Sequence, residues 1–572
     1  MPARLALQEN TVTVPAFAEM AVETPTFEQV EAEMGTLSEA LEDAKSGARQ
    51  LEVIRRWDAL RARIGTWSSM VGLRFNQDTA DEARKKDREY RDRLSPKFTE
   101  LHNAFKKKLL ASPHRAELEK AFGPQAFALW DQDARSYAPA IEKQTVEISK
   151  LGAEYTELLA GARFPFRDNT LTLSELGKYV SDPDRKTREQ ANRLKWSWFD
   201  SRRATLDSLF DKLTRLRHEC ATKLGLRDFV ELGYLKMHRV DYTREDVEAL
   251  RKQIRTEIVP LGLELVRRQG KDLGLAKVMF WDDGIFDAKG NPDPKGDHDW
   301  MIARATEMFD TMGSGLGEFF RLMAGKGLLD LKSRANKAGG GFCTSFPVWG
   351  VPFIFANFNG TKGDVEVFTH EMGHAFQAYS SRKQRLQDYL WPTHESAEIH
   401  SMSLEFLCWP WMDKFFGADA QRFRRVHLAQ SLVFLAYGTA VDHFQHLVYE
   451  KPEATPAERH AMWREMEAAY LPWRDYGDLP HVKDGGAWQQ QRHIYLSPFY
   501  YIDYVLAQIC ALQFWVRADE DRPAAMRDFV KLCERGGEAP FRELARTAGL
   551  RSPFEPGCLA AVVKKARDWL DA

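Results

Sequence analysis

The chain has few cysteines, no long hydrophobic run and almost no net charge. Its 572 residues include six cysteines, which are widely separated and form no C-x-x-C pair or tight cluster. This spacing argues against a disulfide framework and against a zinc site built from cysteines. We therefore expect reduced thiols.

The absence of long apolar segments limits the partners that we expect. No stretch of about 18 consecutive apolar residues occurs, and the N-terminus lacks a basic stretch leading into an apolar one. Lysine and arginine (81) nearly balance aspartate and glutamate (83), which gives a formal net charge of −2. Such a balance creates no global field that would attract nucleic acid or an anionic membrane. We expect neither partner, and a cytoplasmic location by default.

The length of the chain exceeds the size at which a single hydrophobic core keeps growing, so we expect two or more packed lobes with a cleft between them. After an extended N-terminal arm, apolar residues recur at spacings of three and four between Phe27 and Ser112, which predicts long antiparallel helices. The same pattern continues through residues 115–159 and 174–236 and resumes after Gly363. The predicted fold is mainly α.

Two segments interrupt the helical pattern. Residues 280–299 carry consecutive turn signals, which predict a surface loop. Residues 339–363 contain two short strand-like runs joined by a connection with proline and glycine. These runs predict the small sheet of the protein.

The segment around residue 370 carries the clearest chemical motif. His370-Glu371-Met372-Gly373-His374 reads H-E-x-x-H, within a segment of helical periodicity. Histidines four positions apart lie one above the other on a helix, where they can bind one zinc ion. Glu371 would lie at the flank of the metal, where it can hold the water and accept its proton. An ordinary helix with two surface histidines is the competing interpretation.

A catalytic zinc site needs a third protein ligand. The next helix-like segment carries Glu395, Glu398 and Glu405 at spacings of three and seven, so all three lie on one helix face. Spacing alone does not choose between them.

These motifs resemble a known family. Residues 337–341, 353–360, 370–374 and 397–405 are together similar to the thimet oligopeptidase and oligoendopeptidase F family, especially its Pz-peptidase-like bacterial branch. The resemblance implies one Zn²⁺ per chain and hydrolysis of internal bonds in short unstructured peptides, with collagen-like peptides rich in proline and glycine among the candidates.

The resemblance also assigns the acidic residues. It makes Glu398 the third zinc ligand beside His370 and His374. Glu405 then becomes a candidate for orienting a ligating histidine. A simple carboxylate on the helix surface is the alternative interpretation of Glu405.

Residues 493–504 resemble the C-terminal histidine and tyrosine motif of the same family. The resemblance implies that Tyr504 donates to the oxyanion formed during peptide hydrolysis. It implies that His493 and Tyr501 contact the substrate backbone or the intermediate. The distance from His493 to the tyrosines differs slightly from the family pattern, so several tyrosines compete for these roles. An aromatic stripe packed in a helical core is the alternative.

The run Gly339-Gly340-Gly341 lacks the Lys-Ser/Thr ending of a phosphate loop and is not followed by a helix. Glycines in an edge strand permit a close approach of backbone, so an extended peptide can add to that edge by main-chain hydrogen bonds. Such recognition would give a broad sequence preference.

The predicted architecture has two helical lobes around a deep substrate cleft, with a small β-sheet beside the zinc helix. We expect residues 1–200 to form an N-terminal helical wall of the cleft and residues 201–572 to form the catalytic region. The oligomeric state stays open between a monomer and a homodimer.

Two other functions compete with an endopeptidase. A zinc carboxypeptidase or dipeptidase would share H-E-x-x-H and a downstream glutamate. An inactive peptide-binding protein is the alternative of another class. Glu371 argues against it, because a pure binder does not need the base.

Overall fold

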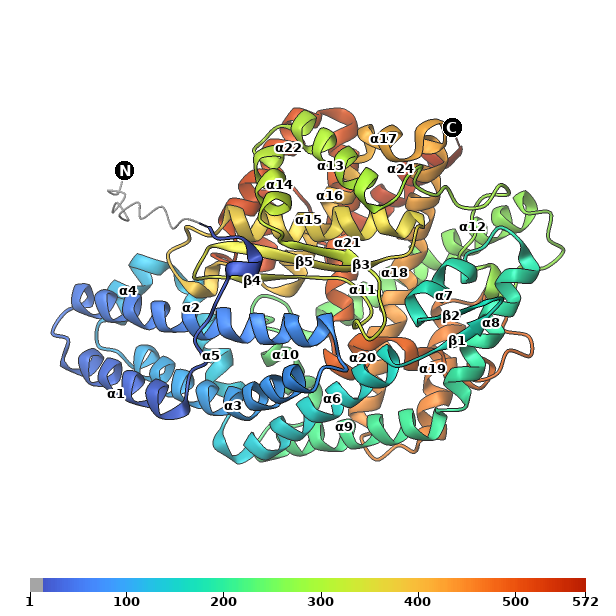
Figure 1. Ribbon diagram of the computed structural model, residues 1–572. Helices are drawn as coiled ribbons and strands as arrows, with labels where there is room; N and C mark the ends of the chain where they lie inside the picture. Colours follow the sequence, from blue (N-terminus) through green and yellow to red (C-terminus); the bar gives the residue numbers. More distant parts are fainter. Residues whose placement is uncertain (1–13, 572) are drawn as a thin grey trace.

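The computed structural model describes residues 14–571. Helices hold 70% of the residues and strands 4%, so the prediction of a mainly α fold with a small sheet is confirmed (Figure 1). Part of the predicted N-terminal arm, residues 1–13, lies outside the described residues. From Val14 to Thr26 the chain forms one short turn, η1 (Phe17–Glu19).

The helices of the first third follow the predicted periodicity. Thr26 caps the first of them, since its hydroxyl accepts from Gln29 N while the Gln29 side chain accepts from Thr26 N. Apolar residues such as Ile54, Phe105 and Leu109 are fully buried between these helices. The elements are α1 (Phe27–Asp43), α2 (Gly47–Gln77), α3 (Glu82–Leu110), α4 (Arg115–Phe122), α5 (Pro124–Ser136), η2 (Pro139–Ile141) and α6 (Glu142–Ala160).

The middle of the chain adds a small hairpin that the sequence analysis missed. Strands β1 (Phe164–Phe166) and β2 (Asn169–Leu171) pair antiparallel. Residues 283–297 form the predicted loop after the short turn η4 (Phe280–Asp282). The helices here are α7 (Leu173–Val180), α8 (Arg185–Asp200), α9 (Arg203–Lys223), α10 (Phe229–Lys236), α11 (Arg244–Gln253), η3 (Ile254–Ile258), α12 (Val259–Asp272), α13 (His298–Met312) and α14 (Leu316–Gly325).

The main sheet has three strands in the order β3-β5-β4. Its two predicted strands are confirmed as β4 (Phe342–Phe346) and β5 (Val351–Phe358), which pair antiparallel. A third strand, β3 (Leu329–Lys332), was missed and runs parallel to β5. The sheet lies between α15 (Lys362–Ser380) and α2 (Figure 1). Among the described strands β3 and β4 are its edges, and β4 also contacts α15, which carries the H-E-x-x-H motif.

The last third is helical, as predicted, and holds the centre of the core. Helix α15 packs against α16, and α16 packs against α21. The elements are η5 (Gln387–Tyr389), α16 (His394–Leu407), η6 (Trp409–Trp411), α17 (Asp413–Phe416), η7 (Gly417–Asp419), α18 (Ala420–Glu450), α19 (Pro456–Tyr470), η8 (Val482–Asp484), η9 (Ala487–Gln490), α20 (Arg492–Leu496), α21 (Tyr501–Glu520), α22 (Arg522–Arg535), α23 (Phe541–Thr547) and α24 (Cys558–Asp571).

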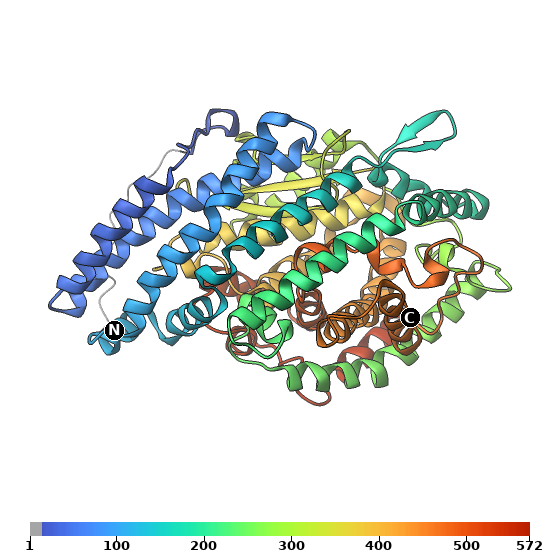
Figure 2. The same cartoon turned by 90° about the horizontal axis from the view of Figure 1, so that it is seen from below.

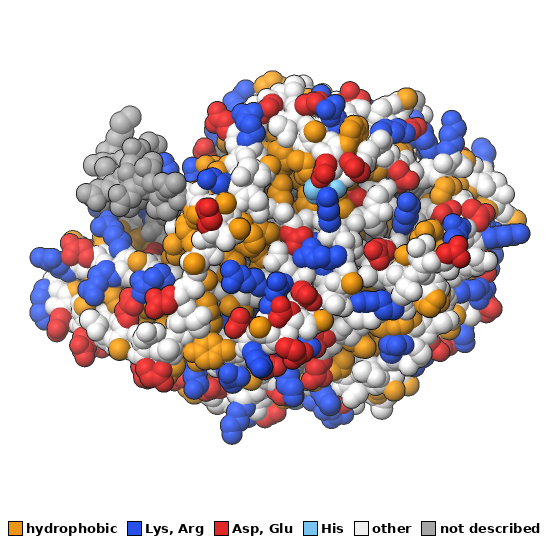
Figure 3. Space-filling model, viewed as in Figure 1, with side chains coloured by type: hydrophobic (Ala, Val, Ile, Leu, Met, Phe, Trp, Pro, Cys, Tyr) orange, Lys and Arg blue, Asp and Glu red, His pale blue; other side chains and the backbone are white. Residues whose placement is uncertain are grey.

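Long helices of the first half lie side by side below the sheet. Helix α3 packs against α2 and α6, and α6 packs against α9, as the blue to green ribbons of Figure 2 show. Acidic and basic side chains are mixed over the face seen in Figure 3, in keeping with the balanced charge of the chain. None of the helices in the described part is both long and apolar enough to cross a membrane.

Candidate active site and metal centre

Helices α15 and α16 come unusually close at the H-E-x-x-H motif. A Cβ atom built on Gly373 would meet His400 O at 2.4 Å and Ser401 Cα at 2.6 Å. Only glycine fits such a backbone contact, because real side chains do not approach other atoms so closely. The close approach brings the histidines of α15 beside the glutamates of α16.

Three side chains point donor atoms at one spot between these helices. The Oε2 atom of Glu398 lies 3.2 Å from His370 Nε2 and 3.1 Å from His374 Nε2. One donor atom from each of the three residues lies within 4.8 Å of the others. Ligand atoms about 2.0–2.1 Å from a tetrahedral zinc ion lie roughly 3.3 Å apart, so two histidines and one carboxylate in this arrangement fit zinc.

The carboxylate of Glu398 also accepts hydrogen bonds from two neighbouring hydroxyls. Tyr500 donates to Glu398 Oε1 at 2.6 Å, and Ser401 donates to Oε2 at 2.7 Å. Although burial opposes its charged form, His374 and His370 keep the pKa of Glu398 well below its usual range. These contacts hold the carboxylate ionised and oriented, as a metal ligand requires.

Glu405 lies on the outer side of His370. Its Oε1 atom is 2.8 Å from His370 Nδ1, and its Oε2 atom is 2.8 Å from His427 Nε2. Trp409 Nε1 donates to His427 Nδ1 at 2.9 Å, which leaves the proton of His427 on Nε2, facing Glu405. A carboxylate on Nδ1 of His370 in turn leaves Nε2 free to bind a metal.

Glu371 has the position and environment of a base. Its side chain is 5% exposed, and its Oε2 atom has no hydrogen-bond partner among residues 14–571. Burial raises its pKa above the usual value of a carboxyl, against the effect of the neighbouring histidines. A Cβ atom on Gly341 would lie 3.2 Å from Glu371 Oε1, so the glycine-rich run before β4 passes directly beside this carboxylate.

The third acidic candidate, Glu395, is not part of the group of donor atoms formed by His370, His374 and Glu398. Thr393 donates to its Oε1 atom at 2.8 Å. Burial, together with the nearby carboxyl of Asp503, raises the pKa of Glu395 well above its usual range. The geometry thus separates Glu398 from Glu395, which the spacing in the sequence did not.

A chain of hydrogen bonds leads to Tyr504. Tyr437 donates to Gln491 Oε1 at 2.9 Å, and Gln491 Nε2 lies 3.0 Å from His493 Nδ1. An amide nitrogen only donates, so Nδ1 accepts and the ring proton resides on Nε2, 3.1 Å from the Tyr504 hydroxyl. Burial, aided by Arg492, lowers the pKa of His493 to about 4, which keeps the ring neutral. Tyr504 then accepts from His493, and its own proton is free for another acceptor.

Tyr501 takes part through its ring. It packs edge-on against His493, with ring centroids 5.3 Å apart, and against Tyr504 at 5.4 Å. No hydrogen bond of its hydroxyl is found within the described part of the chain. The candidate residues of the phenol-rich segment are therefore together, at the side of the cluster where Tyr504 lies 6.5 Å, ring to ring, from His370.

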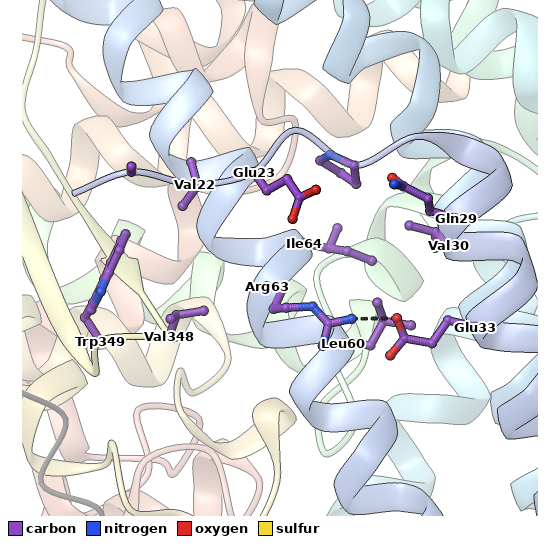
Figure 4. Close-up of a pocket in the computed structure, with 12 residues that line it drawn as sticks. Val22, Glu23, Gln29, Val30, Glu33, Leu60, Arg63, Ile64, Val348 and Trp349 are labelled. Atoms are coloured by element: carbon purple, nitrogen blue, oxygen red, sulfur yellow. Dashed lines mark hydrogen bonds and ion pairs between the residues drawn. The ribbon is translucent and has the colours of Figure 1, made fainter.

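Cavities flank both ends of β4. One of about 460 Å³ adjoins Phe342 and Arg492. Another, of about 420 Å³, lies at the turn between β4 and β5, where Val348 and Trp349 face the helices α1 and α2 (Figure 4).

Several residues near the cluster were missed in the sequence. Tyr500 lay in the phenol-rich segment that was singled out, but nothing in its spacing distinguished it from its neighbours. Ser401 lies three residues after Glu398 on the same helix, a spacing that could have indicated the contact. His427 and Gln491 lie on other segments, and only the packed structure brings them to the site.

Comparisons with known families cover most of the chain. Residues 17–137 match the peptidase M3 N-terminal domain, and residues 178–563 match peptidase family M3. None of the curated proteins compared with the chain matches it.

Solved structures match over nearly the full length. A protein assigned as an oligoendopeptidase F is 45% identical, with a TM-score of 0.96, covering 98% of this chain and 99% of that one. PZ peptidase A, solved with an inhibitor, is 42% identical, with a TM-score of 0.96 and coverage of 97% and 99%. A protein assigned as an oligoendopeptidase F from Bacillus anthracis is 40% identical, with a TM-score of 0.92 and coverage of 98% of both chains.

Proposed function

Because the chain belongs to peptidase family M3, we propose that it cuts internal bonds of short unstructured peptides with one zinc ion held by His370, His374 and Glu398. Membership in this family makes it a metallo-endopeptidase of the oligopeptidase type. The choice of zinc, the residue roles and the substrate range are the proposal. The observation that carries it is the triangle of donor atoms with the unpaired Glu371 carboxylate beside it.

The chemistry follows from what each side chain offers. A bound zinc ion would act as a Lewis acid, which lowers the pKa of water and polarises the scissile carbonyl. Glu371 accepts the proton of the attacking water and later passes it to the leaving amine. Its raised pKa suits this exchange, because a base that must also give its proton back works best near neutrality.

Tyr504 stabilises the negative charge that develops on the carbonyl oxygen. With His493 donating to its oxygen, the Tyr504 hydroxyl has its own proton available for the oxyanion. His493 and Gln491 fix this orientation, and Tyr501 holds the His493 ring in place by packing. Preorganised donors of this kind cost no reorganisation when the charge forms.

Glu405 acts through His370. By accepting from Nδ1, it fixes the ring orientation and increases the basicity of Nε2. His427 and Trp409 hold Glu405 in turn, so the support of the metal site reaches from α15 to α18.

The substrate binds along β4. This strand has β5 on one side only among the described strands, so its other edge offers main-chain groups to an extended peptide. The run Gly339-Gly340-Gly341 precedes it, and the absence of side chains lets peptide backbone approach Glu371. Main-chain recognition fits a broad range of sequences, including collagen-like ones.

The helices of residues 1–200 form the opposite wall of the cleft in this proposal, and residues 201–572 form the catalytic region. An extended strand fits between such walls, whereas a folded protein would first have to unfold, at a cost of roughly 5–15 kcal/mol. Cleavage within the peptide, rather than at an end, distinguishes this function from that of a zinc carboxypeptidase or dipeptidase.

The six cysteines are all free, and five of them are buried. Free thiols persist in reducing compartments, which supports a cytoplasmic location for the enzyme. Cell fractionation tests this part of the proposal, and recovery of the enzyme outside the cytoplasm would contradict it.

A peptide ladder tests the proposal as a whole. We expect the zinc-loaded enzyme to cut peptides of about 5–20 residues internally, whether or not their ends are blocked, and to leave folded proteins intact. Mass spectrometry of the products locates each cut. Chelation should abolish cleavage and added zinc should restore it. Stepwise removal of terminal residues would favour the carboxypeptidase or dipeptidase, and zinc binding without cleavage would favour a peptide-binding protein.

A further inference from the structure

The start of β4 borders a cavity of about 460 Å³. Phe342 of β4 forms part of its wall, opposite residues of α2, α3, α6 and α9. Its volume is typical of ligand pockets, which measure roughly 300–1,000 Å³. Gly341, the residue before Phe342, lies against Glu371, so this cavity adjoins the proposed catalytic centre.

The wall of this cavity is strongly basic. Its charged residues, within the described part of the chain, are Arg88, Arg91, Arg217, Arg492 and Asp92. Asp92 is shared between two of the arginines, since its oxygens lie 3.3 Å from Arg88 Nη1 and 2.7 Å from Arg91 Nη2. Outside the wall, Glu89 Oε1 lies 4.0 Å from Arg88 Nη2. These two carboxylates offset only part of the positive charge of the four arginines.

The other two arginines bind neutral acceptors. Arg217 donates to the Tyr449 hydroxyl at 2.8 Å and to backbone carbonyls. Arg492 donates to the carbonyl of Gly339. Neither forms an ion pair with a carboxylate of residues 14–571, so their charges attract an anion from outside the chain.

Arg88 offers a second, independent sign of an anionic ligand. Its side chain is 6% exposed, and its Nε atom has no hydrogen-bond partner within the described residues. A buried donor of a charged group that is left unpaired costs free energy. Since the Nε atom itself is not exposed, a carboxylate bound in the cavity would offset this cost through its charge and not through a bond to Nε.

An antiparallel arrangement of the peptide on β4 would bring its C-terminal part to this cavity. A peptide that pairs antiparallel with β4 runs from the Phe346 end of the strand towards Gly339. Two residues separate Gly341 from Gly339, a distance of about 7 Å along an extended chain. A carboxylate two or three residues after the cut bond therefore reaches Arg492.

The cavity at the other end of β4 has a different charge balance. It is lined by Glu23, Glu33 and one arginine, Arg63, which pairs with Glu33 at 2.6 Å (Figure 4). The excess of positive charge is thus confined to the end that receives the C-terminal part of the peptide.

We propose that the arginine-lined cavity binds a carboxylate of the substrate on the C-terminal side of the cut bond, with Arg492 and Arg88 as donors. This inference rests on the proposed endopeptidase function. The carboxylate is the C-terminus of the peptide or an acidic side chain near it. Arginine suits both, because its planar guanidinium binds a carboxylate through two parallel hydrogen bonds.

Matched peptides test the proposal. One fluorogenic sequence is prepared as the free acid, as the C-terminal amide, and as amides with Glu or Gln in the third position after the cut. We expect the kcat/KM of the wild type to be about 10- to 100-fold higher for the free acid than for the Gln amide, mainly because of a lower KM. This factor corresponds to the free energy of one charge-assisted hydrogen bond. If the Glu amide regains that efficiency, a side chain serves as well as the C-terminus.

Variants locate the effect. Arg88→Gln should reduce the preference for the carboxylate while cleavage of the Gln amide changes little. Arg492→Gln should reduce the same preference, measured as the ratio of free-acid to Gln-amide cleavage within that variant. Arg88→Gln serves as the second variant because Arg492 adjoins His493 and its loss can disturb the catalytic segment. Arg63→Gln, in the cavity at the other end, is the matched control and should keep the full preference.

Binding separates this inference from the function on which it rests. Labelled peptides bound to zinc-loaded Glu371→Gln, followed by fluorescence anisotropy, report the carboxylate preference without turnover. Equal affinity of acid and amide, or a preference lost only in Arg63→Gln, overturns the inference even if peptides are cleaved. A preference in binding without any cleavage by the wild type supports the pocket and contradicts the proposed function.

Discussion

The N-terminal helices α1–α3 and the central helices α15 and α16 are buried in different ways. Helix α3 buries apolar residues such as Phe105 and Leu109 and exposes charged ones such as Lys107. Helix α16 buries 12 of its 14 residues, among them glutamates, serines and a histidine. Burying polar groups costs free energy unless each finds a partner.

This difference in the polarity of the buried residues separates residues that stabilise the fold from residues with a proposed role in catalysis. In α1–α3, most buried side chains are apolar and are explained by packing, with exceptions such as Arg88, Asn103 and Lys106. In α15 and α16, buried atoms such as Glu371 Oε2 and His374 Nδ1 have no partner within the described residues. Other unpaired buried atoms occur elsewhere in the described residues, but these two lie beside the donor atoms of His370, His374 and Glu398, where a ligand, an ion or water can complete the structure. Substitutions in the two regions should therefore affect different properties.

The largest effect on turnover is expected from Glu371→Gln. The amide keeps the size of the side chain but does not accept a proton, so kcat should fall by about 10²- to 10⁴-fold. Peptide hydrolysis and zinc content are measured on the same zinc-loaded sample. Near-normal turnover of that sample would show that another group is the base.

The next effect distinguishes two glutamates of the same helix. Glu398→Ala should lower zinc affinity by more than about a hundredfold, because it removes a direct ligand and not only a supporting group. Glu395→Ala should retain zinc, since Glu395 binds Thr393 instead. Metal content after dialysis decides between them, and loss of zinc from Glu395→Ala alone would overturn the ligand assignment.

The effect of Glu405→Gln on zinc affinity should lie between the effects of these two variants. We expect its zinc affinity to be lower than that of the wild type by about 10- to 100-fold.

Tyr504→Phe should have a smaller effect, confined to catalysis. Removing only the hydroxyl should lower kcat by about a hundredfold or more, with KM, zinc content and folding almost unchanged. Steady-state kinetics with one peptide measures the two constants. If KM rises and kcat does not fall, Tyr504 contacts the substrate and does not stabilise the oxyanion.

The smallest effect on turnover is expected in the N-terminal region. Leu109→Ala creates a cavity in a core of fully buried residues and should lower the local free energy of unfolding by about 2–5 kcal/mol. Hydrogen exchange of amides in α2 and α3 measures that loss. We expect kcat and zinc content at 25 °C to stay close to those of the wild type. A matching loss of kcat would show that the two regions are coupled.

The same contrast explains what the sequence made predictable. Apolar periodicity predicted the N-terminal helices because packing alone determines which of their faces are buried. It also predicted the helix around residue 370, where Phe368 and Met372 are buried on one side. The strand β3 was missed because its four residues are too few to show a clear alternation of apolar and polar positions.

The candidate site could be predicted only where its residues are close in sequence. His370, Glu371 and His374 form one local motif, whereas the choice of Glu398 over Glu395 depended on the family resemblance. The partners His427 and Gln491 depend on contacts between segments far apart in the chain. Long-range packing of this kind leaves no periodic signal in a single sequence.

The contact at Gly373 sets the distance between the two helices that carry the proposed ligands. Its Cβ would lie 2.4 Å from His400 O, and ordinary contacts begin near 3.4 Å, so even a methyl group would force α15 and α16 apart. Metal sites tolerate deviations of only about 0.2 Å in their bond lengths. The backbone contact at Gly373 thus determines whether the three proposed ligands are spaced to fit the ion. A relative with Ala in place of Gly373 would keep the H-E-x-x-H signature. A search for the motif would therefore classify that relative as an active enzyme, although the spacing of its two helices would no longer fit the metal.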